Sequence, residues 1–516
     1  MKYLILFLLF IASFTNSFSQ DYKTYIINKK VKDFDFNNDF STPLNAFVSL
    51  QYLMANGRKN EFTKKCSFRI QMRYHEDSID EETTKEFQEK MLSDEIKTIV
   101  TYCDSVATVI TKKPNVDFYT YRCLNLEQGI WVNGGEDMGG TSLELADSKV
   151  RKNLPVQLMM LRKTNIILNT PTDTTAFVNY LNANGKAPKQ FLLEALAEHK
   201  LVIYGERHRR ELSWQLLKDL VNDPNFRKTT GTVFMELQSY KQSEIDKFFN
   251  NTVYMDSSIL IGIYQDMQAN GWFDKGGFEF LINLWKLNKQ LPEKEKISVV
   301  FADFQTPIRK IKTKEELEEY KKDSPKRNTH MADIIERTIK TTNDSRNNLY
   351  IVGYGHAYKS QAINEYGESP EGDCSAANQL VKRFSSNDIF CTRVHTSGIN
   401  GYARGGMFDS VLAKNGGNPI AFKLNESPFG KEIIEEWVYE KDYFGNFENN
   451  YDGYIYLSGG PIDKQPEYIL SDIYTEDFVK EIIRRTYLLD AEEEMWFGVP
   501  NKSLTLEALL KDLNDI

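Results

Sequence analysis

Cysteine, long apolar runs and an excess of positive charge are all scarce in this chain of 516 residues. The five cysteines form no CxxC pair, which argues against a zinc ribbon or a thioredoxin-like redox site, and we expect them to be structural. Because five is odd, at least one cysteine is unpaired or bonded outside the chain. The net charge of −9 argues against the basic surface that nucleic-acid-binding proteins present.

The clearest apolar run lies at the start of the sequence. Lys2 precedes an apolar stretch over residues 4–12, and small and polar residues follow as far as Gln20. This order is typical of a secretory signal peptide, which we expect to be cleaved near Ser19 or Gln20. The run is shorter than the roughly 20 residues that span a bilayer, and no cysteine follows it to carry a lipid. We therefore expect residues 1–20 to be removed, and the mature protein to be exported to the periplasm or the exterior without a stable membrane anchor.

The next part of the chain, residues 21–168, is predicted to be a small α+β domain. Residues 21–40 show no clear period and predict a leader segment, whereas Thr42 and Pro43 begin a helix as N-cap and first helical residue. A second helical stretch is expected over 81–111, and strand-like runs over 118–126, 129–133 and 156–168. A helix followed by strands is similar to the SnoaL-like cone fold. Residues 169–189 are rich in Asn, Thr and Pro, and predict a linker with a short helix near 176–181.

From residue 190 onward, helical patterns alternate with short, continuous apolar runs. This alternation predicts an α/β domain over 190–460, with a mostly parallel sheet and helices on both faces. A helical extension is expected over 461–516. The expected strands are residues 201–204, 232–235, 298–302, 349–352, 389–394, 419–424 and 454–457.

Polar side chains stand at the ends of four of these strands. Two of the strands run into GxxH sequences, which end at His208 and His356, and the two others run into Glu236 and Asp303. Because the carboxyl ends of parallel strands share one edge of a sheet, these groups should converge where α/β folds bind ligands. We expect the catalytic residues to be His208, Glu206, Glu236 and His356.

Two kinds of chemistry fit this set of side chains. A neutral imidazole can take a proton from water while a carboxylate orients the ring and stabilises its charged form. Alternatively, His nitrogens and carboxylate oxygens can bind a metal that lowers the pKa of a bound water. The metal ligands would then be His208, Glu236, His356 and Asp303. We expect Arg327 and Tyr354 to contact the substrate.

Two GxxH sequences with a strand-end glutamate between them resemble the superfamily that joins erythromycin esterases, ChaN-type haem-binding lipoproteins, TraB and the Tiki proteases. The segment 327–332, Arg-Asn-Thr-His-Met-Ala, is similar to the superfamily's Arg-Asn/Asp-x-x-Met-Ala segment. Phe408 and Asp409, and residues 418–424 and 451–457, resemble its late strand region. The resemblance covers about 190 to 460.

The resemblance implies three different activities. Resemblance to the erythromycin esterases implies a metal-independent lactone hydrolase. Resemblance to the Tiki-type members implies a metal-dependent protease, and resemblance to the ChaN-type members implies haem binding. The implied cofactor is therefore none, a divalent metal (Mn, Co, Fe or Zn) or haem. This chain has Glu-x-His where many erythromycin esterases have Glu-x-x-His, and it lacks the lipobox of ChaN.

We weigh two functions on these grounds. The first is an exported hydrolase of an ester, lactone or amide, acting on a small molecule or a peptide. Here His208 activates water, Glu206 and Glu236 orient it, and His356 binds a metal or stabilises the oxyanion. The alternative is a haem- or metal-binding uptake protein without catalysis, in which the same His and Tyr residues are ligands.

Overall fold

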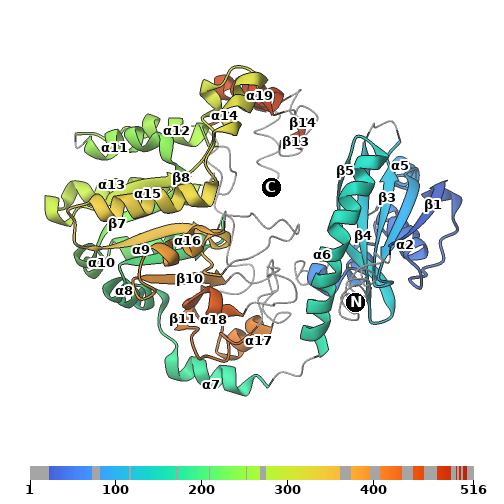
Figure 1. The fold of residues 1–516 in the computed structure, drawn as a ribbon, viewed down its shortest axis with the longest axis horizontal. Helices are drawn as coiled ribbons and strands as arrows, with labels where there is room; N and C mark the ends of the chain where they lie inside the picture. Colours follow the sequence, from blue (N-terminus) through green and yellow to red (C-terminus); the bar gives the residue numbers. More distant parts are fainter. Residues whose placement is uncertain are drawn as a thin grey trace, which may run out of the picture.

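The computed structural model describes most of the chain after the predicted signal peptide. The described residues are 22–71, 82–114, 118–169, 173–208, 210–251, 253–267, 275–360, 374–395, 407–432, 446–457, 473–489, 495–496, 499–500 and 504–507. The signal peptide lies outside them and stays a prediction. Among the described residues, no helix is both long and apolar enough to cross a membrane. Two β-sheets, each covered by helices, make up the two main bodies (Figure 1).

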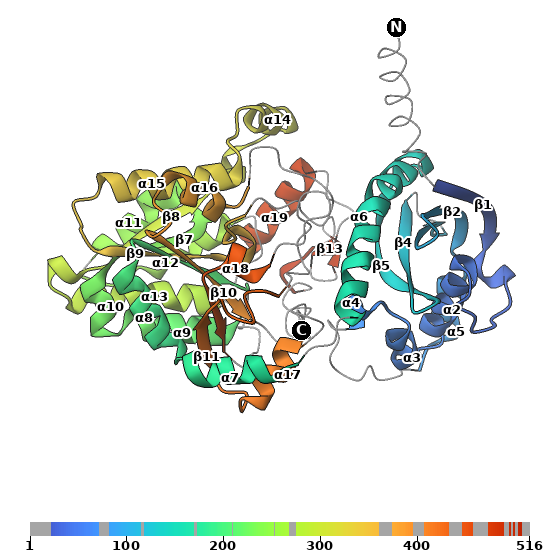
Figure 2. The same cartoon turned by 60° about the horizontal axis from the view of Figure 1, so that its bottom comes forward.

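The N-terminal body is a five-stranded antiparallel meander in the order β1-β2-β3-β4-β5. Helix α2 covers one face through Phe47 and Leu50, and α6 covers the other through Val150 and Leu154 (Figure 2). The bounds are β1 Tyr22–Lys30, α2 Pro43–Ala55, α3 Lys59–Lys64, α4 Phe68–Gln71, α5 Lys85–Leu92, β2 Glu95–Tyr102, β3 Val106–Lys112, β4 Tyr119–Glu127, β5 Ile130–Gly140 and α6 Leu143–Asn169.

Three sequence predictions in this body are wrong. The expected leader contains β1, an edge strand that buries so few side chains that it shows no apolar period. The expected helix over 81–111 holds only the short α5 before β2 and β3, which are rich in β-branched residues. The expected strand over 156–168 belongs to α6, whose buried residues Val150, Leu154, Leu158 and Leu161 follow a helical spacing.

The C-terminal body contains a seven-stranded sheet in the order β11-β12-β10-β6-β9-β7-β8. All neighbours are parallel except β11 and β12, which are antiparallel. The α/β prediction is therefore confirmed. The strands are β6 Leu201–Glu206, β7 Thr230–Gln238, β8 Ser298–Asp303, β9 Asn347–Gly353, β10 Ile389–His395, β11 Ile420–Lys423 and β12 Gly453–Tyr456.

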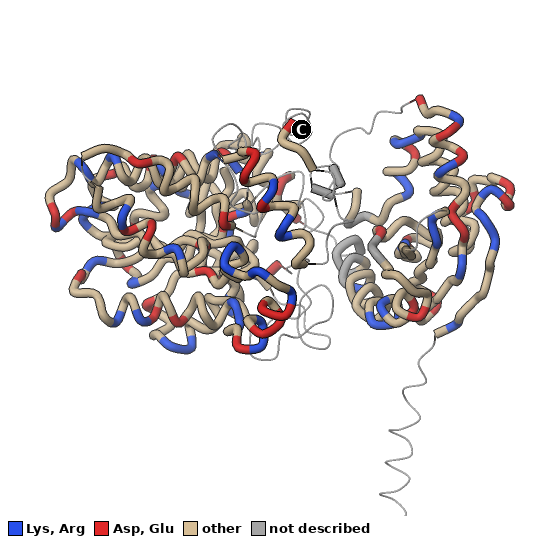
Figure 3. The backbone as a smooth tube through the Cα atoms, turned by 90° about the horizontal axis from the view of Figure 1, so that it is seen from above, with Lys and Arg blue, Asp and Glu red and all other residues tan. Residues whose placement is uncertain are grey.

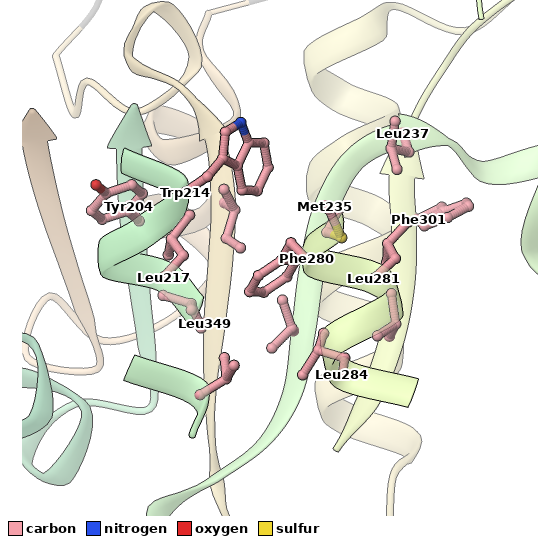
Figure 4. Close-up of a cluster of buried hydrophobic side chains, with 14 of the residues drawn as sticks. Tyr204, Trp214, Leu217, Met235, Leu237, Phe280, Leu281, Leu284, Phe301 and Leu349 are labelled. Carbon is pink, nitrogen blue, oxygen red and sulfur yellow. The ribbon is translucent and has the colours of Figure 1, made fainter. Parts of the chain in front are cut away.

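Both faces of this sheet are buried, because successive strand residues point to opposite sides. In β6, Val202 and Tyr204 pack with one set of helices, and Leu201 and Ile203 with the other. Figure 4 shows α9 and α13 side chains, including Trp214, against the first face. The first set is α8 Pro188–Glu198, α9 Glu211–Val221, α10 Pro224–Thr229, α11 Gln242–Asn250, α12 Ser257–Gln265, α13 Lys275–Gln290 and α19 Glu476–Leu488; the second is α7 Thr175–Asn184, α15 Arg327–Thr341, α16 Ala376–Arg383, α17 Met407–Lys414 and α18 Phe447–Asn450.

The predicted linker and extension both contain helices that belong to the C-terminal body. The linker carries α7, which contains the short helix expected near 176–181, and it ends where α8 begins. The backbone N–H of Lys186 bonds to the carbonyl of Ala421 in β11 at 2.9 Å. The extension contains α19 and a small hairpin of β13 Met495–Trp496 and β14 Val499–Pro500. Helix α14 Lys314–Lys322 lies elsewhere in the chain, between β8 and α15. Acidic and basic residues are interspersed along both bodies (Figure 3).

Candidate active site

The predicted polar residues meet at the carboxyl edge of the seven-stranded sheet. Strands β6, β9, β7 and β8 are consecutive neighbours there. His208 follows β6, and His356 ends the short 3-10 turn η6 Tyr354–His356, directly after β9. Glu236 lies where the register of β7 shifts against β8, and Asp303 ends β8. The edge that the sequence predicted therefore brings both histidines and the three carboxylates to one side of the sheet.

His208 and Glu206 form a hydrogen-bonded pair at the end of β6. Nδ1 of His208 lies 2.6 Å from Oε1 of the buried Glu206 carboxylate. Burial by itself would lower the pKa of the imidazole, but the charge and hydrogen bond of Glu206, together with the Glu236 charge, raise the pKa of His208 to about 9. The contact with the carboxylate fixes Nδ1 as the ring nitrogen that carries the proton.

Two glycines allow these groups to come close together. A Cβ at Gly353 would lie 2.9 Å from Nε2 of His208 and 3.4 Å from Oε2 of Glu236. A Cβ at Gly205 would lie 2.5 Å from the Thr392 carbonyl oxygen and 2.8 Å from Cβ of Ala357. The glycines of the two GxxH sequences are therefore required by close packing around the histidines.

Arg327, the first residue of α15, connects two carboxylates of the edge. Its Nε and Nη2 donate to the two oxygens of Asp303 at 2.6 and 2.9 Å. Nη2 also donates to Oε1 of Glu236 at 2.6 Å. Burial raises the pKa of the Asp303 carboxyl, and the guanidinium bonded to both of its oxygens opposes this shift. The two-pronged contact with Asp303 fixes the plane of the guanidinium.

Glu236 is buried and has polar partners on both oxygens. Oε2 accepts the backbone N–H of Gly353 at 2.7 Å, and Oε1 bonds Arg327. Burial alone would raise the pKa of this carboxyl, but His356, His208 and Arg327 outweigh burial and hold it well below its usual range. Glu236 is thus an anion that joins β7 to the end of β9.

His356 lies within contact distance of the same Arg327–Glu236 pair. Its Nδ1 is 2.6 Å from Oδ1 of Asn328, and its Nε2 is 3.4 Å from both Nη1 of Arg327 and Oε1 of Glu236. Burial lowers the pKa of His356, and this effect outweighs the opposing charge of Glu236. An amide oxygen accepts hydrogen bonds only, so Nδ1 carries the proton of the neutral ring and Nε2 presents a lone pair.

The predicted metal ligands do not fit a metal ion in this arrangement. Among the described residues, no group of three or more His, Cys, Asp or Glu side chains has the geometry to hold one. The oxygens of Asp303 are bonded to Arg327 and Gln305, and those of Glu236 to Arg327 and Gly353. The guanidinium of Arg327 therefore occupies the place among these carboxylates that a cation would need.

Tyr354, which we expected to contact substrate, packs against a buried arginine. The guanidinium carbon of Arg393 in β10 lies 4.5 Å from the centre of the Tyr354 ring, a cation–π distance. The hydroxyl of Tyr451 donates to the Tyr354 carbonyl oxygen at 3.1 Å. These contacts hold the turn that carries His356.

Two contributors to the site were not anticipated from the sequence. Asn328, which fixes the His356 ring, follows Arg327 in the segment that carries the family resemblance, so that segment was the available signal. Arg393 lies inside an apolar strand, Ile-Phe-Cys-Thr-Arg-Val-His, and no sequence pattern links it to Tyr354. Its partner is determined by the packing of β10 beside β6.

Comparisons with known proteins found similarity only at the level of structure. No family model and no curated protein matches the chain. A succinoglycan biosynthesis protein matches at 9% identity and a TM-score of 0.41, over 56% of this chain and 98% of that one. A mutant of the erythromycin esterase EreC in its open conformation matches at 10% identity and a TM-score of 0.36, over 53% of this chain and 95% of that one.

A further match is the structure of ChaN of Campylobacter jejuni with cofacial haem, at 15% identity and a TM-score of 0.24. It covers 40% of this chain and 85% of that one. The solved structures thus include an esterase and a haem-binding protein, which are two of the four groups that the GxxH resemblance names. At these identities and TM-scores, the likeness assigns no activity to this chain.

Proposed function

We propose that this protein is an exported hydrolase of carboxylic esters, lactones or amides. The observation that carries the proposal is the His208–Glu206 pair beside a guanidinium that two buried carboxylates hold in place. A base and a fixed cation on one edge of a sheet are the two parts that hydrolysis of an acyl group needs.

His208 is the general base of the proposed reaction. In its neutral form, Nε2 takes a proton from a water molecule while the water oxygen bonds to the carbonyl carbon of the substrate. The Glu206 carboxylate keeps Nδ1 protonated and stabilises the imidazolium that results. The imidazolium then returns the proton to the leaving oxygen or nitrogen, and the bond between that atom and the carbonyl carbon breaks.

Arg327 stabilises the negative charge that develops on the carbonyl oxygen. Glu236 and Asp303 hold the guanidinium plane before substrate arrives, so little reorganisation is needed during the reaction. His356, with a lone pair on Nε2, lies next to Nη1 and helps to keep that nitrogen in position.

A panel of p-nitrophenyl esters, lactones and anilides, assayed with the purified mature protein, tests the proposal. Once a substrate is found, His208→Ala should lower kcat about 100-fold or more, the typical contribution of a general base. His199→Ala is the matched control, because His199 precedes β6, at the opposite edge of the sheet from His208, and bonds the Asn387 carbonyl. Activity that is unchanged in both His208→Ala and Arg327→Met would contradict the assignment.

A haem titration separates this proposal from haem-binding uptake. Tyr354, one ligand that the haem interpretation would use, is covered by Arg393, and His356 faces Arg327 and Glu236. We expect no Soret shift at micromolar haem. A stoichiometric Soret shift that His356→Ala abolishes would favour uptake over hydrolysis.

A further inference from the structure

A second pair of groups suited to acyl transfer lies on the same sheet edge, outside the His208–Glu206 pair. Ser239 directly follows β7 and begins the 3-10 turn η2 Ser239–Lys241, and His330 lies in α15, three residues after Arg327. Nε2 of His330 is 2.8 Å from Oγ of Ser239. This is the hydrogen bond that an activated hydroxyl makes with its base.

The surroundings of His330 favour the role of a base. The ring packs edge-on against Phe304, with ring centres 5.4 Å apart, which fixes its plane. Burial lowers the pKa of His330, opposed by the Asp303 and Asp333 carboxylates, while Arg337 acts in the same direction as burial. The ring is therefore neutral at pH 7 and can accept a proton, and two nearby carboxylates stabilise the imidazolium that forms.

Ser239 is also placed where a substrate can reach it. Both Ser239 and His330 are partly exposed. The turn η2 runs directly into α11, and the first N–H groups of such a helical segment have no acceptor within the helix. A strand that ends in a serine and continues into a helix presents the hydroxyl next to these N–H groups. They are suitable donors to an oxyanion formed on a carbonyl bonded to Oγ.

We propose that Ser239 is the nucleophile, and His330 the base, of a second, covalent acyl-transfer centre for carboxylic esters. Oγ forms a bond to the carbonyl carbon while its proton moves to Nε2 of His330. The carbon–oxygen bond to the alcohol breaks, and the alcohol leaves with that proton. Water then bonds to the carbonyl carbon of the acyl-serine while Nε2 of His330 takes its proton. His330 returns that proton to Oγ, the bond between Oγ and the carbonyl carbon breaks, and the carboxylic acid leaves. The Asp303 carboxylate acts on His330, and Arg327, which is bonded to Asp303, acts on His208.

An alkyl fluorophosphonate tests the proposal without knowledge of the natural substrate. Oγ of an activated serine displaces fluoride from phosphorus, and His330 takes the hydroxyl proton. The full mature chain is incubated with the probe, and the adduct is located by intact-mass measurement and peptide mapping. We expect one adduct, on Ser239, that is absent in Ser239→Ala and forms about 100-fold more slowly in His330→Gln.

Two further variants make the result specific. Ser243→Ala removes a nearby serine of α11 that bonds Glu244, and it should label like the wild type. His208→Ala should lose the water-activated hydrolysis and keep the labelling, so failure of one centre is distinguishable from failure of the other. No adduct on the folded wild type, an adduct elsewhere, or equal labelling rates in His330→Gln and the wild type would overturn the proposal.

Discussion

The raised pKa of His208 makes a quantitative prediction for the proposed hydrolysis. With a pKa of about 9, only about 1% of His208 is neutral at pH 7. Because the base must be neutral, kcat/KM should rise about tenfold per pH unit between pH 6 and 8 and level off above about 9. In Glu206→Gln the hydrogen-bonded anion is gone, and the midpoint of the profile should fall by about 1 to 3 units.

The same shift can be followed without a substrate. NMR titration of the His208 ring should give, in each protein, the same midpoint as the kinetic profile of that protein, so the midpoint should be lower in Glu206→Gln than in the wild type. The ring signals of His199 should be the same in both proteins. Folding stability offers a second readout. Since the pKa of His208 is raised on folding, its contribution is fully present below about pH 6.5 and is lost as the pH rises through about 9. This loss should be smaller in Glu206→Gln. A midpoint that is equal in the two proteins would refute the reasoning.

Three further variants test the packing of the site and of the core. Gly353→Ala places a methyl group against the His208 ring and should reduce kcat about 10- to 100-fold. The control is Gly262→Ala, whose added methyl group meets no atom within 4 Å and which should leave kcat unchanged in the same assay. Arg327→Met leaves two buried carboxylates without their cation and should cost about 3 kcal/mol of unfolding free energy in urea; a loss below about 1 kcal/mol would contradict the ion-pair description. Phe280→Ala empties a fully buried position of the core and should cost about 3–5 kcal/mol in the same measurement; a loss below about 1 kcal/mol would contradict the packing of this cluster.

The sequence predicted the parallel sheet well, because its signals are local. Strands buried on both faces are continuous apolar runs, and the polar residues that end them stand out against those runs. Glu236 and Asp303 could therefore be assigned to one edge of the sheet from the order of residues alone. The N-terminal body was predicted less well. Its edge strand β1 owes its conformation to backbone pairing with β2, which leaves no apolar period to detect.

The partners within the site could not be predicted from the sequence. That Arg327 bonds both Asp303 and Glu236 depends on where α15 begins relative to β7 and β8, and three-dimensional packing determines that position. The same holds for Tyr354, whose ring faces Arg393 because β10 lies two strands away from β9. Strand ends could be placed on an edge, but the direction of each side chain came from helices and turns that are distant in the sequence.

The ion-pair contacts of Arg327 also bear on how the protein folds. They join strand β7, strand β8 and helix α15, which are far apart along the chain, so they form only after long loops have closed. A chain in which α15 has not docked on the sheet would still contain its individual helices. The guanidinium of Arg327 and the carboxylates of Asp303 and Glu236 would, however, remain in water. Catalytic competence should therefore appear at the last, cooperative step of folding, and regained activity would report completion of the native topology more strictly than recovered helix content.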